Sequence, residues 1–125
     1  MAVEWLDEPE DDDFDSAADY LSMLAEHDVV EKTVGALRKA ELVERKAKDI
    51  LRAARLELLS PDNASVTADL RKIVDGERLA PILLVRGDAL RGMQLEVADG
   101  YHRVCASYVI SENVPIPCRL VSWQT

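Results

Sequence analysis

The chain has 125 residues, with 15 lysines and arginines, 24 aspartates and glutamates, and a formal net charge of -9 at pH 7. This length is typical of one domain with a modest core, and a hydrophobic content of 48% excludes wholesale disorder. No apolar stretch approaches the roughly 20 residues that a membrane-spanning helix needs, and the N-terminus lacks the pattern of a secretory signal. A cytoplasmic protein that is not embedded in a membrane is therefore expected.

The negative charge is concentrated at the N-terminus. Residues 1–28 contain 11 of the 24 acids and no lysine or arginine, whereas the rest of the chain has 13 acids and 15 bases. The sequence therefore predicts an acidic segment joined to a near-neutral body. An acidic chain of this kind disfavours nucleic-acid binding by the whole protein, but it allows a local basic face.

Residues 1–15 are predicted to form a flexible acidic arm. The run Glu8–Asp13 repels itself and resists burial, although Trp5, Leu6 and Phe14 interrupt the acidic pattern. Two interpretations stay open. The arm is disordered, or it docks on a basic surface of this chain or of a partner, with its aromatic residues as anchors.

Residues 16–55 are predicted to form a helical extension. Ser16 is a favourable N-cap for a first helix and Asp28 for a second, and a third helix is expected over Leu42–Leu56. A fourth helix follows the turn at residues 60–63. The apolar residues of these helices recur at the spacing that buries one face.

The hydrophobic period then changes to that of strands. Pro81–Arg86 is a nearly continuous apolar run, typical of a buried strand, and Gln94–Ala98 alternates like the return strand of a hairpin. Tyr101–Glu112 is predicted to be a helix and Cys118–Trp123 a last strand. The expected fold class is α+β, with N-terminal helices followed by a small β-β-α-β core over residues 56–125.

The junction Asp99–Arg103, between the second strand and the following helix, is the strongest candidate site. Such a junction presents free N–H groups and the positive end of the helix dipole, which suit a phosphate. Gly100 permits close approach of the backbone, Arg103 adds a forked positive charge, and His102 adds a titratable donor. Asp99 has three alternative roles: metal ligand, orienting group for His102, or helix cap.

A basic stripe on the third predicted helix is a second candidate. Arg45, Lys48, Arg52 and Arg55 recur at helical spacing. Apart from a solvated face, two functions stay open for this stripe. It extends the phosphate site, or it receives the acidic arm and thereby masks that site.

Four segments, in order along the chain, resemble the ParB/sulfiredoxin superfamily: Leu56–Asn63, Leu79–Val85, Leu95–Ala106 and Val114–Val121. The third segment resembles the strand–Gly-x-x-Arg–helix signature of the superfamily, and the fourth resembles its closing Ile-Pro strand. The resemblance implies a ParB/sulfiredoxin-like core in a small stand-alone ParB-like protein of the bacterial type.

In that superfamily the Gly-x-x-Arg turn binds nucleotide phosphates, of ATP in sulfiredoxin and of CTP in ParB. The resemblance therefore implies ATP or CTP with Mg²⁺ as the ligand, and Asp99 as the metal ligand. If phosphate is hydrolysed, Asp99 and His102 are the implied catalytic residues. The nucleotide-binding candidates are the residues of the turn and of the basic stripe: Gly100, Tyr101, His102, Arg103, Arg45, Lys48 and Arg52.

Two departures from the superfamily narrow this function. Tyr101 occupies the position of sulfiredoxin's catalytic cysteine, so sulfinic-acid reduction is not expected. ParB has an acid after the glycine, and this chain has no room for ParB's DNA-binding and dimerisation domains, so chromosome partitioning is not expected either. Two alternatives remain: a non-enzymatic adaptor that recruits a protein partner through the acidic arm, and a ParB-like DNA nuclease or DNA-associated protein, which the acidic composition disfavours.

Overall fold

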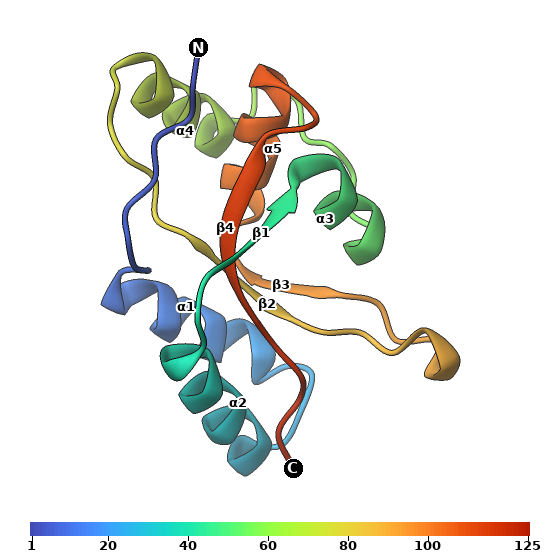
Figure 1. Cartoon of the computed structure of the whole chain (residues 1–125). Helices are drawn as coiled ribbons and strands as arrows, with labels where there is room; N and C mark the ends of the chain where they lie inside the picture. Colours follow the sequence, from blue (N-terminus) through green and yellow to red (C-terminus); the bar gives the residue numbers. More distant parts are fainter.

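The computed structural model describes all 125 residues and contains five α-helices, a short 3-10 helix and a four-stranded sheet (Figure 1). The predicted α+β class is confirmed. None of the helices has the length and apolar character needed to cross a membrane. The elements in chain order are α1 (Asp11–Leu21), α2 (His27–Lys39), β1 (Val43–Lys46), α3 (Ala47–Ala54), α4 (Ala64–Val74), β2 (Ile82–Val85), η1 (Ala89–Arg91), β3 (Glu96–Asp99), α5 (Tyr101–Ile110) and β4 (Pro115–Val121).

The sheet has the strand order β1-β4-β2-β3. β2 pairs antiparallel with β3, as the predicted hairpin requires, and parallel with β4, while β4 pairs antiparallel with β1. Pro115 and Pro117 of β4 lie opposite β1, and the pairing with β2 begins only at Cys118. The prolines therefore occupy the part of β4 that has a single neighbouring strand, where a missing N–H group is tolerated.

Helices cover both faces of the sheet. Ile82 and Leu84 of β2 pack into a core with α3, α4 and α5, whereas Leu83 and Val85 pack into a second core with α1 and α2. Figure 1 shows α1 and α2 below the strands and the other three helices above them. Successive side chains of a strand point to opposite faces, so a strand buried on both faces is apolar throughout. This explains the continuous apolar run of β2.

The first helix begins at Asp11, ahead of the predicted start at Ser16, and this corrects the prediction of a flexible arm over residues 1–15. Glu10 is the N-cap, and its N–H group donates to Asp13 Oδ2 at 2.9 Å, as in a capping box. The acids of the first turn also lie at the positive end of the helix dipole. Capping and the dipole therefore favour a helix in this acidic run.

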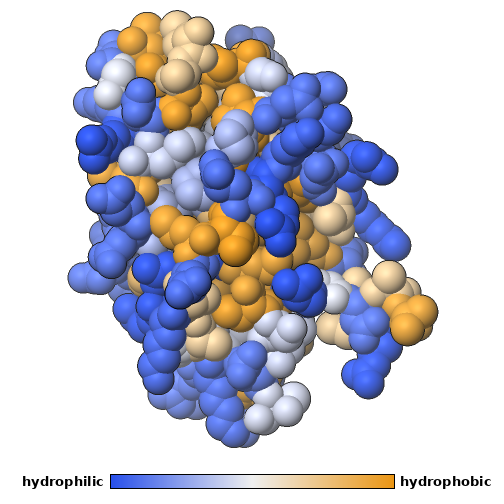
Figure 2. Space-filling model, in the orientation of Figure 1, coloured by the Kyte–Doolittle hydropathy of each residue, from blue (hydrophilic) through white to orange (hydrophobic).

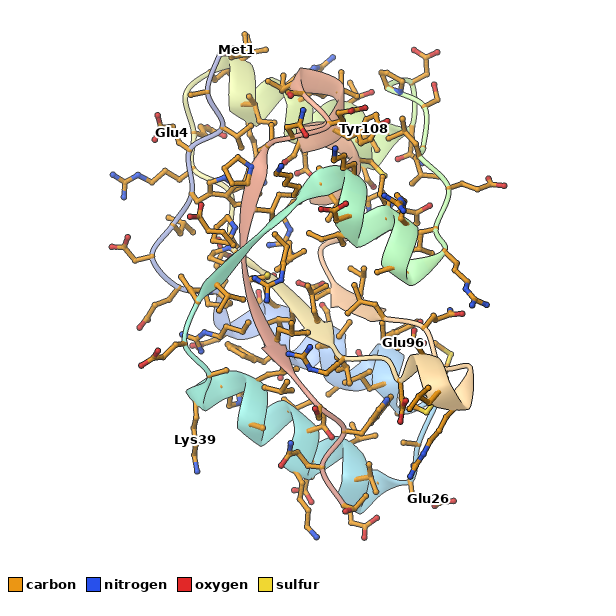
Figure 3. The ribbon with its side chains drawn as sticks, turned by 45° about the vertical axis from the view of Figure 1, so that its right-hand side comes forward. Met1, Glu4, Glu26, Lys39, Glu96 and Tyr108 are labelled. Carbon is orange, nitrogen blue, oxygen red and sulfur yellow. The ribbon has the colours of Figure 1, made fainter.

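The segment before α1 packs along the body of the protein. The N–H group of Leu6 donates to Leu79 O at 2.8 Å, and the N–H group of Leu79 donates to Glu4 O at 2.9 Å. Trp5 packs against the core, and Phe14 is 5% exposed. Figure 3 follows this segment from Met1 past Glu4 to α1. Its aromatic residues anchor it on this chain, but in the two apolar cores rather than on a basic surface.

The helix predicted over Leu42–Leu56 is wrong in its first turn. These residues form β1, and α3 begins only at Ala47. Pairing with β4 satisfies the backbone polar groups that a helical turn would have satisfied. A tertiary contact therefore makes these residues a strand instead of a helix. Arg45 therefore lies on a strand, and Arg55 ends α3 with a φ of 55°. The four basic residues do not form one helical stripe.

Candidate functional site

The predicted turn joins β3 to α5. Asp99 is the last residue of β3, and Gly100 is the N-cap of α5 with a φ of 113°. A Cβ atom at residue 100 would lie 2.3 Å from Ile82 Cγ2 and 3.2 Å from Arg103 Nη2. Glycine is therefore required here both by the left-handed backbone and by the close approach to β2.

The first turn of α5 presents free N–H groups. The amides of Tyr101, His102 and Arg103 have no acceptor, and the first hydrogen bond of the helix is donated by the N–H group of Val104 to Gly100 O at 3.1 Å. No side chain caps this end of the helix. Three donors and the positive end of the dipole are thus available to an anion.

The side chain of Arg103 is held by groups of this chain. It is 13% exposed, and Nη2 lies 2.6 Å from Asp99 Oδ2 and 3.5 Å from Asp13 Oδ1. Nη1 donates to Ala80 O at 2.8 Å. Arg103 therefore fastens α5 to the start of β2 and to α1, and two ionised carboxylates outnumber its single positive charge.

Burial raises the pKa of Asp99 from 3.8 to about 6. The Asp13 carboxyl, which is hydrogen-bonded to Asp99, raises this pKa further, and the positive charge of Arg103 opposes the rise. Desolvation disfavours the ionised form, and a second carboxylate beside it acts in the same direction. Compared with the unfolded chain, the folded protein therefore favours the protonated form of Asp99, although the carboxylate is still mostly ionised at pH 7.

This pKa has a consequence for stability. The folded protein binds more protons than the unfolded chain between about pH 4 and pH 6, so its stability falls as the pH rises through that range. Relative to Asp99→Asn, which lacks this titration, the wild type is expected to lose about 1–2 kcal/mol of unfolding free energy between pH 5 and pH 7. Urea denaturation of both proteins at the two pH values measures this loss. An identical pH dependence in the two would contradict the assignment.

A cleft of about 370 Å³ borders the turn. Asp99, His102 and Arg103 line it, together with Lys72 of α4 and Arg78 of the segment before β2. The cleft is polar and carries charges of both signs. Both predicted catalytic residues, Asp99 and His102, therefore face the same space.

Five charged residues at this cleft were not predicted from the sequence: Glu10, Asp13, Asp69, Lys72 and Arg78. Burial raises the pKa of Asp69, and the neighbouring Lys72, Arg103 and His102 act against this rise. The helical spacing of Asp69 and Lys72 places them on one face of α4, but that spacing does not say which neighbour the face meets. Asp13 reaches the cleft only because α1 docks against β3.

Tyr101 does not line this cleft and lies instead at a neighbouring one. The hydroxyl donates to Glu57 O at 2.6 Å, and the ring stacks on His102 with 5.7 Å between the centroids. Tyr101 thus ties α5 to the loop between α3 and α4. His102 lines both clefts.

The predicted Mg²⁺ ligand, Asp99, does not belong to a cluster of metal-binding side chains. No three histidine, cysteine, aspartate or glutamate side chains converge anywhere in the chain in a way that could hold a metal ion. Oδ2 of Asp99, the predicted ligand, is paired with Arg103. These residues therefore form no all-protein magnesium site, whereas one or two carboxylates together with the phosphates of a nucleotide commonly hold this ion, so Mg²⁺ bound with a nucleotide stays a prediction.

Arg45, Lys48 and Arg52 lie away from the turn. Arg45 and Arg52 line a separate cleft between α3 and the β2–β3 hairpin, and Lys48 lines neither cleft. The structure therefore brings together the residues of the turn but does not join them to these three basic residues.

Fold and cleft together define an α+β domain with a polar cleft at the N-terminal end of α5. Comparison of the chain with protein-family models, with curated proteins and with solved structures gave no match. The functional interpretation therefore rests on the residues of this chain.

Proposed function

We propose that the protein binds a phosphate ester, such as a nucleotide, in the cleft beside the first turn of α5. The proposal is carried by one observation: the first turn of α5, whose amides have no acceptor, contributes His102 and Arg103 to a cleft that also contains the cations Lys72 and Arg78. Amide groups at a helix N-terminus bind phosphate oxygens in many proteins. The resemblance of this turn to that of the ParB/sulfiredoxin superfamily supports the same ligand class.

Asp13 and Asp99 oppose an incoming phosphate. Both carboxylates face the guanidinium of Arg103, so an anion that approaches Arg103 meets excess negative charge. Asp13 comes from α1, far from the turn in sequence. In this proposal the acidic α1 masks the cleft, as the docking interpretation of the arm suggested, but through Arg103 rather than through the basic residues of α3.

Removing the charge of Asp13 is expected to strengthen ligand binding. We expect Asp13→Asn to raise the affinity for ATP about tenfold at low ionic strength, because it removes one negative charge beside Arg103. The amide oxygen of asparagine still accepts a hydrogen bond from the N–H group of Glu10, so the helix cap is preserved. Isothermal titration calorimetry measures the affinity.

Asp12→Asn is the matched control, because it makes the same charge change one residue away at an exposed position. Its effect on affinity should stay within about twofold. Equal effects of the two variants would indicate net charge alone and would contradict masking. Deletion of residues 1–14 is a poor substitute, because Trp5 and Phe14 belong to the packed body.

Ligand binding without hydrolysis is the form of the proposal that the geometry supports best. Asp99, one of the two predicted catalytic residues, is paired with Arg103, and no three side chains converge to hold a metal ion. The adaptor alternative loses support, because the aromatic residues that were to anchor a partner pack against the two cores of this chain.

A further inference from the structure

A second cleft, of about 540 Å³, lies between α3 and the β2–β3 hairpin. Figure 2 shows the end of this hairpin projecting from the body of the protein. The floor of the cleft is apolar and includes Leu84, Leu95 and Leu120. Its volume and mixed lining are typical of sites for small molecules.

The rim of this cleft is cationic in an otherwise acidic chain. Of its four arginines, only Arg52 has an acidic partner, Asp49 at 3.9 Å, and Asp49 is the only acid of the rim. Arg55 and Arg86 form no ion pair. Arg45 donates only to a backbone carbonyl. Four guanidinium groups and one carboxylate concentrate positive potential at one place.

The backbone fixes both walls of the cleft. The N–H group of Leu95 donates to Ala53 O at 3.1 Å and thereby joins the hairpin to the end of α3. The N–H group of Arg86 donates to Val121 O of β4 at 2.7 Å. A Cβ atom at Gly87 would lie 2.4 Å from Met93 O on the opposite arm, so the two arms of the hairpin are closely packed here. The backbones that carry Arg55 and Arg86 are therefore in place before a ligand enters.

Arg55 has an unfavourable backbone conformation. It is the only non-glycine residue with a positive φ, at 55°, and it follows the last turn of α3. Glycine is preferred at this position because it has no Cβ to clash in the left-handed conformation. An arginine where glycine would be less strained indicates that its side chain has a role other than folding.

We propose that this cleft binds a small organic phosphate with an apolar or aromatic body. Arg55 and Arg86 hold the phosphate by charge-assisted, bidentate hydrogen bonds, and the body lies on the apolar floor. No residue lines both this cleft and the one beside α5, so the two sites are independent.

The probe is 1-naphthyl phosphate, with inorganic phosphate and 1-naphthol as its two separate halves. At low ionic strength we expect naphthyl phosphate to bind at least about tenfold more tightly than either half, by isothermal titration calorimetry. Arg86→Gln and Arg55→Gly should each weaken this binding about tenfold. Arg91→Gln makes the same charge change on the same hairpin outside the cleft and should change the affinity by less than about twofold.

Arg55→Gly is expected to change stability and binding in opposite directions, which gives a second measurement. It should raise the melting temperature of the ligand-free protein by about 3 °C, because it relieves the left-handed strain while it weakens binding. Absence of saturable binding would overturn the proposal, as would an equal loss in Arg91→Gln and Arg86→Gln. Binding that responds to Asp13→Asn but not to Arg86→Gln would also overturn it and would leave the site beside α5 standing.

Discussion

Replacing Gly100 with alanine is expected to lower the free energy of unfolding by about 2–6 kcal/mol. The φ of 113° costs any residue with a side chain about 1–3 kcal/mol. The new Cβ atom would also lie 2.3 Å from Ile82 Cγ2, and relieving such overpacking costs about 1–3 kcal/mol more. Urea denaturation followed by circular dichroism measures the loss.

Gly35 in α2 provides the control. A Cβ atom at this residue would have no neighbouring atom within 4 Å, and the residue lies inside a helix, so Gly35→Ala should stabilise the protein by about 0.5–1 kcal/mol. Changes of the same sign in the two variants would contradict the steric explanation of Gly100. Because packing against β2 suffices to explain this glycine, its presence alone does not indicate a phosphate site.

Replacing Arg103 with alanine is expected to lower the free energy of unfolding by about 3–5 kcal/mol at pH 7. The change leaves Asp99 and Asp13 facing each other without the guanidinium that holds both. At pH 5 the cost should be smaller, because Asp99, whose pKa is raised to about 6, is then largely protonated. Denaturation at both pH values tests the prediction.

Arg78→Ala is the matched control for this change, because Arg78 lines the same cleft, is exposed and forms no ion pair. Its effect should stay within about 0.5 kcal/mol. A cost for Arg103→Ala no larger than that of Arg78→Ala would show that the network does not stabilise the fold. A loss of ligand binding in Arg103→Ala is ambiguous, since the same side chain fastens α5.

The strands β2, β3 and β4 and the last helix could be predicted from the sequence because local pattern and tertiary environment agree there. The apolar run of β2 is buried on both faces, and the glycine before α5 marks a backbone that only glycine adopts without strain. β1 could not be predicted in this way. Its four residues continue a helical periodicity, and only β4, more than sixty residues later in the chain, makes them a strand.

The candidate site also has a part that local sequence predicts and a part that depends on long-range contacts. The turn was predicted from residues adjacent in sequence, whereas Asp13 reaches Arg103 only through the docking of α1. That docking depends on the buried Phe14 and on the hydroxyl of Tyr20, which donates to the carboxylate of Glu96 at 2.5 Å. Glu96 is labelled on β3 in Figure 3. The repulsion among the acidic residues predicted a flexible arm. The long-range contacts of Phe14 and Tyr20 outweigh this repulsion.

The binding experiment on Asp13→Asn is most direct when it is followed by NMR, because each amide reports separately. A ¹H–¹⁵N titration of this variant with ATP at low ionic strength should produce its largest chemical-shift changes at the backbone amides of Tyr101, His102 and Arg103. The same titration of Asp12→Asn should need about tenfold more ligand for equal changes. Unchanged amides in the first turn of α5, or largest changes at Arg55 and Arg86 instead, would contradict phosphate binding at this turn.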